Sequence, residues 1–124
     1  MAVIGIGVDL VDIVRLSTVL DRTPGMADRV FSAAELAYAG PSTDVGMRRL
    51  AARFAAKEAV SKALGAESTV RWREVEVVSA DGCRPELRLT GETAALAARA
   101  GITTWHLSLT HEGNLAMAYV VAES

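Results

Sequence analysis

The feature that most constrains the fold is an alanine-rich helix that needs a very small packing partner. The segment from about Met47 to Leu64 contains no glycine or proline, and Gly65 follows it as a typical helix end. At about 100° per residue, one stripe of this helix consists of Ala52, Ala56, Ala59 and Ala63. Such a stripe lets another backbone approach closely, so we expect a glycine-bearing element beside it.

The predicted partner is a strand near the N-terminus. Residues 3–9 alternate Ile4, Ile6 and Val8 with Gly5, Gly7 and Asp9, which is the periodicity of a strand. The glycine face fits the alanine stripe, and Asp9 ends that face. Glu58 lies at the border of the alanine stripe on the helix. This packing would therefore bring the carboxylates of Asp9 and Glu58 together at the opening of the contact between strand and helix.

The remaining elements alternate between helices and strands. Asp12 is the expected N-cap of a short helix that keeps Arg15 off its apolar stripe. A second helix is expected to start within 31–35, where Ser32 and Glu35 have capping-box spacing, before a loop at 40–46.

The pattern of the C-terminal half predicts two hairpins with a helix between them. We expect a strand at 70–79 with a bulge between Trp72 and Val75, a turn at Asp81-Gly82 and a strand at 86–89. A helix at 91–100 and strands at 104–110 and 115–122 complete the chain. The fold class is therefore α+β, with a mostly antiparallel sheet packed against the long alanine-rich helix.

Composition narrows the function classes. The 124 residues, 51% of them hydrophobic, predict one folded domain over 1–124 rather than a disordered chain. A net charge of −2 argues against a nucleic-acid partner, because proteins that bind nucleic acids normally carry an excess of basic residues. No apolar run reaches the length of a membrane span, and we expect a cytoplasmic protein.

Asp9 and Glu58 leave two interpretations open. Two neighbouring carboxylates repel unless a cation lies between them, and a site with only oxygen ligands favours Mg²⁺ together with phosphate oxygens. Alternatively, Glu58 pairs with Lys62 one helical turn later, and Asp9 caps the turn after its strand.

Two other patterns favour a phosphate-bearing ligand, each with a plainer alternative. Residues 48–62 hold five basic residues against Glu58 alone, which fits a small polyanion or simply a solvated helix face. The strand at 104–110 places His106, Ser108 and Thr110 on one side and His111 follows on the other, which fits phosphate binding or a solvated sheet face.

Five stretches together resemble the holo-acyl-carrier-protein synthases, which are small 4′-phosphopantetheinyl transferases. They are GIGVDLVDIVRL (5–16), FSAAEL (31–36), RFAAKEAVSKALG (53–65), RPELRLTG (84–91) and HLSLTHEGNLAMAYVV (106–121). The resemblance implies that fold and a transfer of 4′-phosphopantetheine from CoA to a serine of an apo acyl carrier protein. Adenosine 3′,5′-bisphosphate would be the second product, and the pathway would be fatty-acid or polyketide biosynthesis.

The same resemblance implies roles for individual residues. Asp9 and Glu58 match the magnesium ligands, and Lys62 would neutralise phosphate charge. The family's positions near the CoA phosphates are matched in this chain by Arg53, Ser108 and His111. Arg15 matches the basic residue that faces the carrier protein. The base that takes the serine proton is either Glu58 or a water held by Glu35, whose capping-box position also explains it without catalysis.

The family also implies a homotrimer with active sites at subunit interfaces. This chain departs from the family pattern after Gly65, where only residues 66–69 precede the W-x-x-V-E-V stretch, so contacts of a longer loop are not carried over. Two rival functions use the same ligand: a CoA pyrophosphatase, although the glutamate-rich nudix helix is missing, and a non-catalytic domain that binds CoA or a carrier protein.

Overall fold

The computed structural model describes residues 2–65, 70–79 and 82–124. Its elements are β1 (Val3–Asp12), α1 (Ile13–Arg22), α2 (Met26–Val30), α3 (Ala33–Ala39), α4 (Asp44–Leu64), the 3-10 turn η1 (Trp72–Glu74), β2 (Val75–Val78), β3 (Glu86–Leu89), α5 (Gly91–Arg99), β4 (Thr104–Glu112) and β5 (Leu115–Glu123). The short loop after Gly65 and Asp81 of the predicted turn lie outside the described residues.

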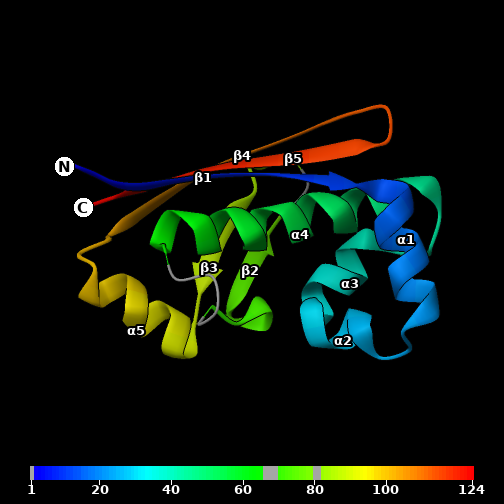
Figure 1. Ribbon diagram of the computed structural model, residues 1–124, viewed down its shortest axis with the longest axis horizontal. Coiled ribbons are helices and arrows are strands. Elements are labelled where there is room, and N and C mark those ends of the chain that lie inside the picture. Colours follow the sequence, from blue (N-terminus) through cyan, green and yellow to red (C-terminus); the bar gives the residue numbers. More distant parts are fainter. Residues whose placement is uncertain (1, 66–69, 80–81) are drawn as a thin grey trace.

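A three-stranded antiparallel sheet in the order β1-β5-β4 lies along one side of α4 (Figure 1). Alternate residues of β5 point toward this helix and are fully buried: Ala116, Ala118, Val120 and Ala122. Ala116, Ala118 and Val120 join the buried alanines of α4 in the main hydrophobic core, whereas Ala122 packs in a smaller cluster with Ala97 and Ile102. The expected α+β class is confirmed, as is the packing of the sheet on the long helix.

Direct backbone contact joins β1 to α4. A Cβ atom added to Gly5 would lie 2.0 Å from the carbonyl oxygen of Ala63, and one added to Gly7 would lie 1.8 Å from that of Ala59. Neither position has room for any side chain. The predicted pairing of the glycine face with the alanine stripe is confirmed at these two positions.

On β1 and β5 the opposite face of the same sheet is exposed and largely apolar. On β1 the outward residues Ile4, Ile6, Val8 and Leu10 are between 43% and 60% exposed. Tyr119 of β5 pairs with Val8 and is 41% exposed, so the apolar surface continues onto the neighbouring strand. No described helix covers this face (Figure 1).

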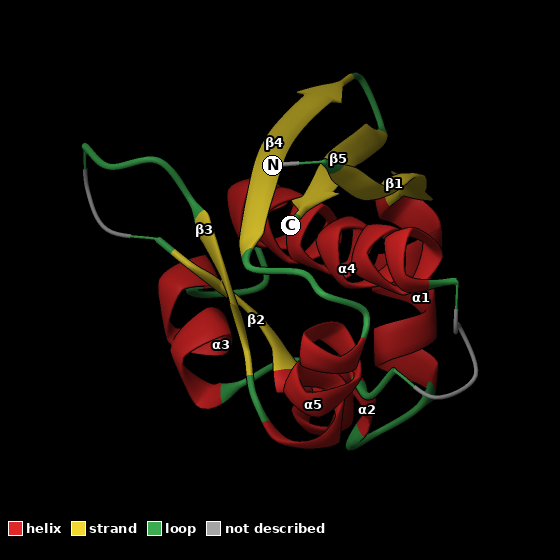
Figure 2. Cartoon of the chain, turned by 90° about the vertical axis from the view of Figure 1, so that its left-hand side faces the viewer, coloured by secondary structure: helices red, strands yellow, loops and turns green. Residues whose placement is uncertain are grey.

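A second antiparallel pair, β2-β3, lies beside α3 and α5 (Figure 2). The predicted hairpin pairing is confirmed, but the expected strand over 70–79 with a bulge is wrong. Residues Trp72–Glu74 instead form η1, and the strand begins at Val75. The physical reason is tertiary: the carbonyl of Trp72 accepts a hydrogen bond from Lys57 of α4.

Glu74, the last residue of η1, anchors the following helix. Its carboxylate accepts hydrogen bonds from the backbone of Glu92 and from both the backbone and hydroxyl of Thr93, at the start of α5. These bonds, those from Thr93 above all, hold the pKa of Glu74 below its ordinary value. The predicted helix at 91–100 is confirmed as α5.

The long helix α4 begins earlier than the sequence pattern predicts. Thr43 caps it by accepting the backbone N–H of Gly46, a residue that the sequence pattern predicts to lie in a loop. Gly46 is buried inside the first turn, where an added Cβ would lie 2.0 Å from the carbonyl oxygen of Pro41. In the described ranges neither α4 nor any other helix is both long and apolar enough to cross a membrane.

The glycine contact makes a first prediction. Replacing Gly7 with alanine forces β1 and α4 apart, because the new Cβ meets backbone rather than a movable side chain. We expect the free energy of unfolding to fall by about 3 kcal/mol or more. Urea unfolding of the variant at one fixed protein concentration measures this change.

The matched control is Val3→Ala on the same strand, where the side chain is 57% exposed. This change is expected to stay within about 0.5 kcal/mol of the unmodified protein. A Gly7→Ala variant as stable as the control would contradict the claim that the two backbones touch.

Candidate active site

Asp9 and Glu58 line the same pocket, as the packing of strand on helix predicts. The pocket has a volume of about 410 Å³ and lies between the end of β1, the start of α1 and the middle of α4. Its other lining residues are Leu10, Val11, Asp12, Arg15, Leu16, Val19, Met26 and Phe54. The two carboxylates therefore share one solvent-facing hollow within a single chain.

A cation already neutralises one of these carboxylates. Lys62 places its Nζ 3.0 Å from Oδ1 of Asp9 and 3.0 Å from the carbonyl oxygen of Val8. The alternative in which Lys62 pairs with Glu58 is therefore wrong, and so is a capping role for Asp9. The residue that caps α1 is Asp12, whose carboxylate accepts the backbone N–H of Arg15 at 2.9 Å.

The donor set fits a hard divalent cation. Asp9 and Glu58 offer only carboxylate oxygens, which Mg²⁺ prefers, and this ion commonly takes one or two carboxylates together with waters and phosphate oxygens. The ammonium of Lys62 beside Asp9 indicates that this end of the pocket favours positive charge. Within the described ranges no three acidic, histidine or cysteine residues gather to enclose a metal completely.

Glu35 lies in the interior, away from this pocket. Its side chain is fully buried and forms an ion pair with the equally buried Lys57, with 2.8 Å between Oε1 and Nζ. It also closes the predicted capping box, because it and Ser32 each accept the other's backbone N–H. These contacts account for Glu35 structurally.

Lys57 joins four elements at one buried point. Besides Glu35 of α3, its ammonium donates to the carbonyl oxygens of Trp72 in η1 and Val75 in β2. Burial lowers the pKa of Lys57, and the negative charge of Glu35 opposes that shift. Among the basic residues of 48–62, Lys57 and Arg53 are buried whereas Arg49 and Lys62 are exposed, so the alternative of a solvated helix face holds for only part of this set.

Two of the three candidate CoA-binding residues come together elsewhere. Arg53 and His111 line a hollow of about 270 Å³ that also contains Arg48, Arg49 and Thr110. Ser108 does not line it: the residue lies on the exposed face of β4, opposite Tyr119 of β5. This hollow shares no lining residue with the pocket of the two carboxylates.

Arg53 is held rigidly at the edge of this hollow. Its guanidinium donates to the hydroxyl of Ser79 at 2.8 Å and stacks 4.4 Å from the ring centroid of Tyr38. Burial lowers its pKa. Its buried Nε has no hydrogen-bond partner among the described residues.

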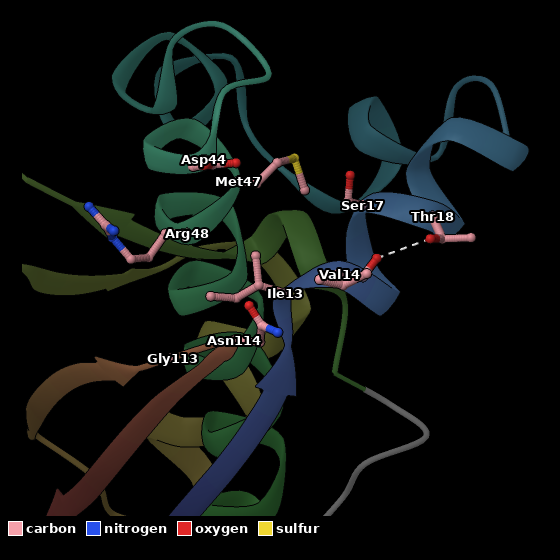
Figure 3. A pocket seen from close by; sticks show the side chains of 9 residues that line it. All are labelled: Ile13, Val14, Ser17, Thr18, Asp44, Met47, Arg48, Gly113 and Asn114. Atoms are coloured by element: carbon pink, nitrogen blue, oxygen red, sulfur yellow. Dashed lines mark hydrogen bonds between the residues drawn. The ribbon is translucent and has the colours of Figure 1, made fainter.

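A further hollow, of about 360 Å³, lies between α1, the β4–β5 turn and the first turns of α4 (Figure 3). Figure 3 shows Ile13 and Met47 facing it, with Asn114 from the turn beside them. None of the residues predicted for the site lines this hollow.

Sequence reasoning missed Trp72 and Tyr38. The indole Nε1 of Trp72 donates to Oε1 of Glu58 at 2.9 Å, and the ring of Tyr38 stacks against both Arg49 and Arg53. Both aromatic residues are far from their partners along the chain, so no spacing rule connects them. Their scarcity, two tryptophans and two tyrosines in 124 residues, was the available signal.

Residues 5–120 match the family model described as the 4′-phosphopantetheinyl transferase superfamily. The chain belongs to this superfamily. A holo-[acyl-carrier-protein] synthase of Frankia casuarinae is 56% identical over 124 residues, which span all of both chains.

Solved structures of the superfamily share the whole architecture. The holo-[acyl-carrier-protein] synthase of Neisseria meningitidis matches with a TM-score of 0.87 and 29% identity, covering 99% of this chain and 100% of that one. The Chronobacterium ammoniagenes synthase in complex with CoA matches with a TM-score of 0.85 and 31% identity, covering 99% and 98%. The family and fold expected from the sequence motifs are both confirmed.

Proposed function

We propose that the chain is a magnesium-dependent holo-[acyl-carrier-protein] synthase. It transfers 4′-phosphopantetheine from CoA to a serine of an apo acyl carrier protein and releases adenosine 3′,5′-bisphosphate. The supporting observation is that Asp9 and Glu58 line one pocket in a member of the 4′-phosphopantetheinyl transferase superfamily. Residues 1–124 act as one catalytic domain in the cytoplasm, serving fatty-acid or polyketide biosynthesis.

Asp9 and Glu58 are the proposed metal ligands. Bound Mg²⁺ supplies positive charge to the pyrophosphate oxygens of CoA. Lys62 lies 3.0 Å from Asp9 and is 42% exposed at its side chain, so its ammonium can turn to a phosphate oxygen while staying at the same pocket. Asp9 and Glu58 would thus hold the cation, and Lys62 would add positive charge beside the phosphates, because positioning and charge neutralisation are the main tasks of a phosphoryl-transfer site.

Glu58 is also the proposed general base. The oxygen of the carrier serine forms a bond to the β-phosphorus, the bond to the leaving phosphate oxygen breaks, and the serine proton passes to Glu58. Glu35 is the less favoured candidate, because its carboxylate is fully buried and already engaged with Lys57 and the backbone of Val77.

The CoA phosphates are proposed to lie against Arg53 and His111. Their hollow also contains Arg48 and Arg49, so it concentrates positive charge. Since this hollow is separate from the carboxylate pocket within one chain, one CoA molecule would bridge two subunits. Ser108, on the exposed sheet face, would then contribute from the subunit boundary.

The exposed apolar sheet face supports a homotrimer. The residues Ile4, Ile6, Val8, Leu10 and Tyr119 form a continuous surface that water does not favour. A closed cyclic assembly covers that face and brings each carboxylate pocket toward the basic hollow of a neighbour.

The chemical function has a direct test. Incubation with CoA, Mg²⁺ and a panel of apo carrier proteins should add the mass of one phosphopantetheine to a carrier, measured by intact mass spectrometry. Asp9→Asn and Glu58→Gln, which keep shape but remove a ligand charge, should each abolish the transfer while circular dichroism stays unchanged.

Other mass changes identify the rival functions. Free phosphopantetheine with an unmodified carrier would indicate a CoA pyrophosphatase, and no product with any carrier would indicate a binding domain. Near-normal turnover by either variant would refute the assigned metal ligands.

Assembly is tested by light scattering. The chain should have the mass of a trimer, and Ile6→Lys should give folded, inactive monomers because it places a charge at the centre of the apolar face. Ala98→Lys on the exposed side of α5 is the control and should remain trimeric and active. A monomer with full activity would rule out the shared site.

Carrier docking is tested at Arg15, which is exposed at the rim of the carboxylate pocket. Carrier proteins present an acidic helix, so Arg15→Glu should replace attraction with repulsion. The KM for carrier should rise about tenfold, while the KM for CoA stays the same and the salt dependence flattens.

The control for Arg15 is Arg99→Glu in the last turn of α5, which makes the same change of charge away from the pocket. It should leave both KM values unchanged. Equal losses for CoA and carrier in the Arg15 variant would show that this residue does not dock the carrier.

A further inference from the structure

Trp72 contacts the proposed metal ligand directly. Its indole N–H donates to Oε1 of Glu58 at 2.9 Å, although the two residues belong to different elements, η1 and α4. The side chain of Trp72 is 39% exposed, so it lies at the surface of the site rather than in the core.

Two further contacts hold Trp72 in place, one to its backbone and one to its ring. The carbonyl oxygen of Trp72 accepts a hydrogen bond from the buried ammonium of Lys57 at 2.9 Å. Its ring lies 6.2 Å from the ring of Phe54, centroid to centroid, in a tilted arrangement. Phe54 also lines the carboxylate pocket, so two residues of α4 that precede Glu58 hold the backbone and the ring of Trp72.

The hydrogen bond reaches Glu58 from a hollow that Asp9 does not line. Glu58 lines two hollows. It shares the first with Asp9, and it shares the second, of about 810 Å³, with Trp72. A carboxylate has two oxygens and about four lone-pair directions, so it can accept the indole N–H and still ligate a cation. A donor on one oxygen fixes the rotation of the group and thus the direction of the remaining lone pairs.

We propose that Trp72 is a positioning residue that orients the Glu58 carboxylate toward the cation shared with Asp9. This inference rests on the proposed metal site and assigns Trp72 the role of a hydrogen-bond partner behind a metal ligand. Loss of such a partner typically weakens metal affinity by about 10-fold to 100-fold. Orientation of the Glu58 carboxylate requires the indole N–H of Trp72. An aromatic ring without this N–H could only pack.

The test compares Trp72→Phe with Trp105→Phe. Phenylalanine keeps an aromatic ring beside Phe54 but removes the N–H, and Trp105, the second tryptophan of the chain, lies in β4. With Mn²⁺ as the probe and free ion measured by electron paramagnetic resonance, Trp72→Phe should raise the dissociation constant about tenfold. Trp105→Phe should leave it unchanged.

A double-mutant cycle separates positioning from packing. In the Glu58→Gln background, adding Trp72→Phe should produce no further loss of Mn²⁺ affinity, because the tryptophan acts through that carboxylate. Unchanged affinity in the single variant, or an equal loss in both backgrounds, would overturn the proposal.

A fluorescence measurement keeps the proposal testable if Trp72→Phe does not fold. In the Trp105→Phe protein Trp72 is the only indole, so Mg²⁺ should change its emission, and Glu58→Gln should remove that change. An emission that Mg²⁺ does not alter would overturn the role.

Failure of the proposed function can be told apart from failure of this role. No phosphopantetheine transfer by the unmodified protein, together with metal binding that depends on Trp72, would refute the synthase function alone. Transfer with metal binding that ignores Trp72 would refute the positioning role alone.

Discussion

The approach of the β1 backbone to the α4 backbone determines where the rest of the molecule can lie. Gly5 and Gly7 rest directly on the carbonyl groups of Ala63 and Ala59, a separation that no side chain would permit. Asp9 follows Gly7 on the same face of the strand, and Glu58 precedes Ala59 on the helix. The distance between the two carboxylates is therefore set by two regular elements in backbone contact, which hold a site more rigidly than loops would.

A buried ion pair complements this contact on another side of α4. The ammonium of Lys57 has three N–H donors, and they meet Glu35, the Trp72 carbonyl and the Val75 carbonyl. An ion pair out of water is tolerable only when its hydrogen bonds are complete, and losing one partner costs about 3–5 kcal/mol. Neighbouring residues of one helix thus have different tasks: Lys57 anchors η1 and β2, and Glu58 faces the pocket.

Local patterns predicted much of this arrangement. The alternation of glycine and isoleucine placed β1, the alanine stripe placed α4, and the spacing of Ser32 and Glu35 predicted a capping box that the structure contains. Each of these signals depends on neighbours within a few positions. The convergence of Asp9 and Glu58 is predictable because it depends on a single long-range contact, that of glycine against alanine.

The errors arise where distant parts of the chain decide local structure. The turn η1 replaces a strand because Lys57, fifteen residues earlier, binds the Trp72 carbonyl. Arg53 and Lys57 are buried rather than solvated because partners from other elements cover them, and no helical periodicity reports such partners. The separation of Arg53 and His111 from the carboxylate pocket is likewise a property of the whole fold.

The central claim is that the glycine–alanine contact brings Asp9 and Glu58 together as ligands of one cation. Crystals soaked in Mn²⁺ and measured at the manganese absorption edge test it most directly, because the anomalous signal locates the ion without reference to activity. The account predicts one peak in the pocket of about 410 Å³, within coordinating distance of an oxygen from each carboxylate. A peak that contacts neither residue, or a pocket without a peak at saturating Mn²⁺, would contradict it.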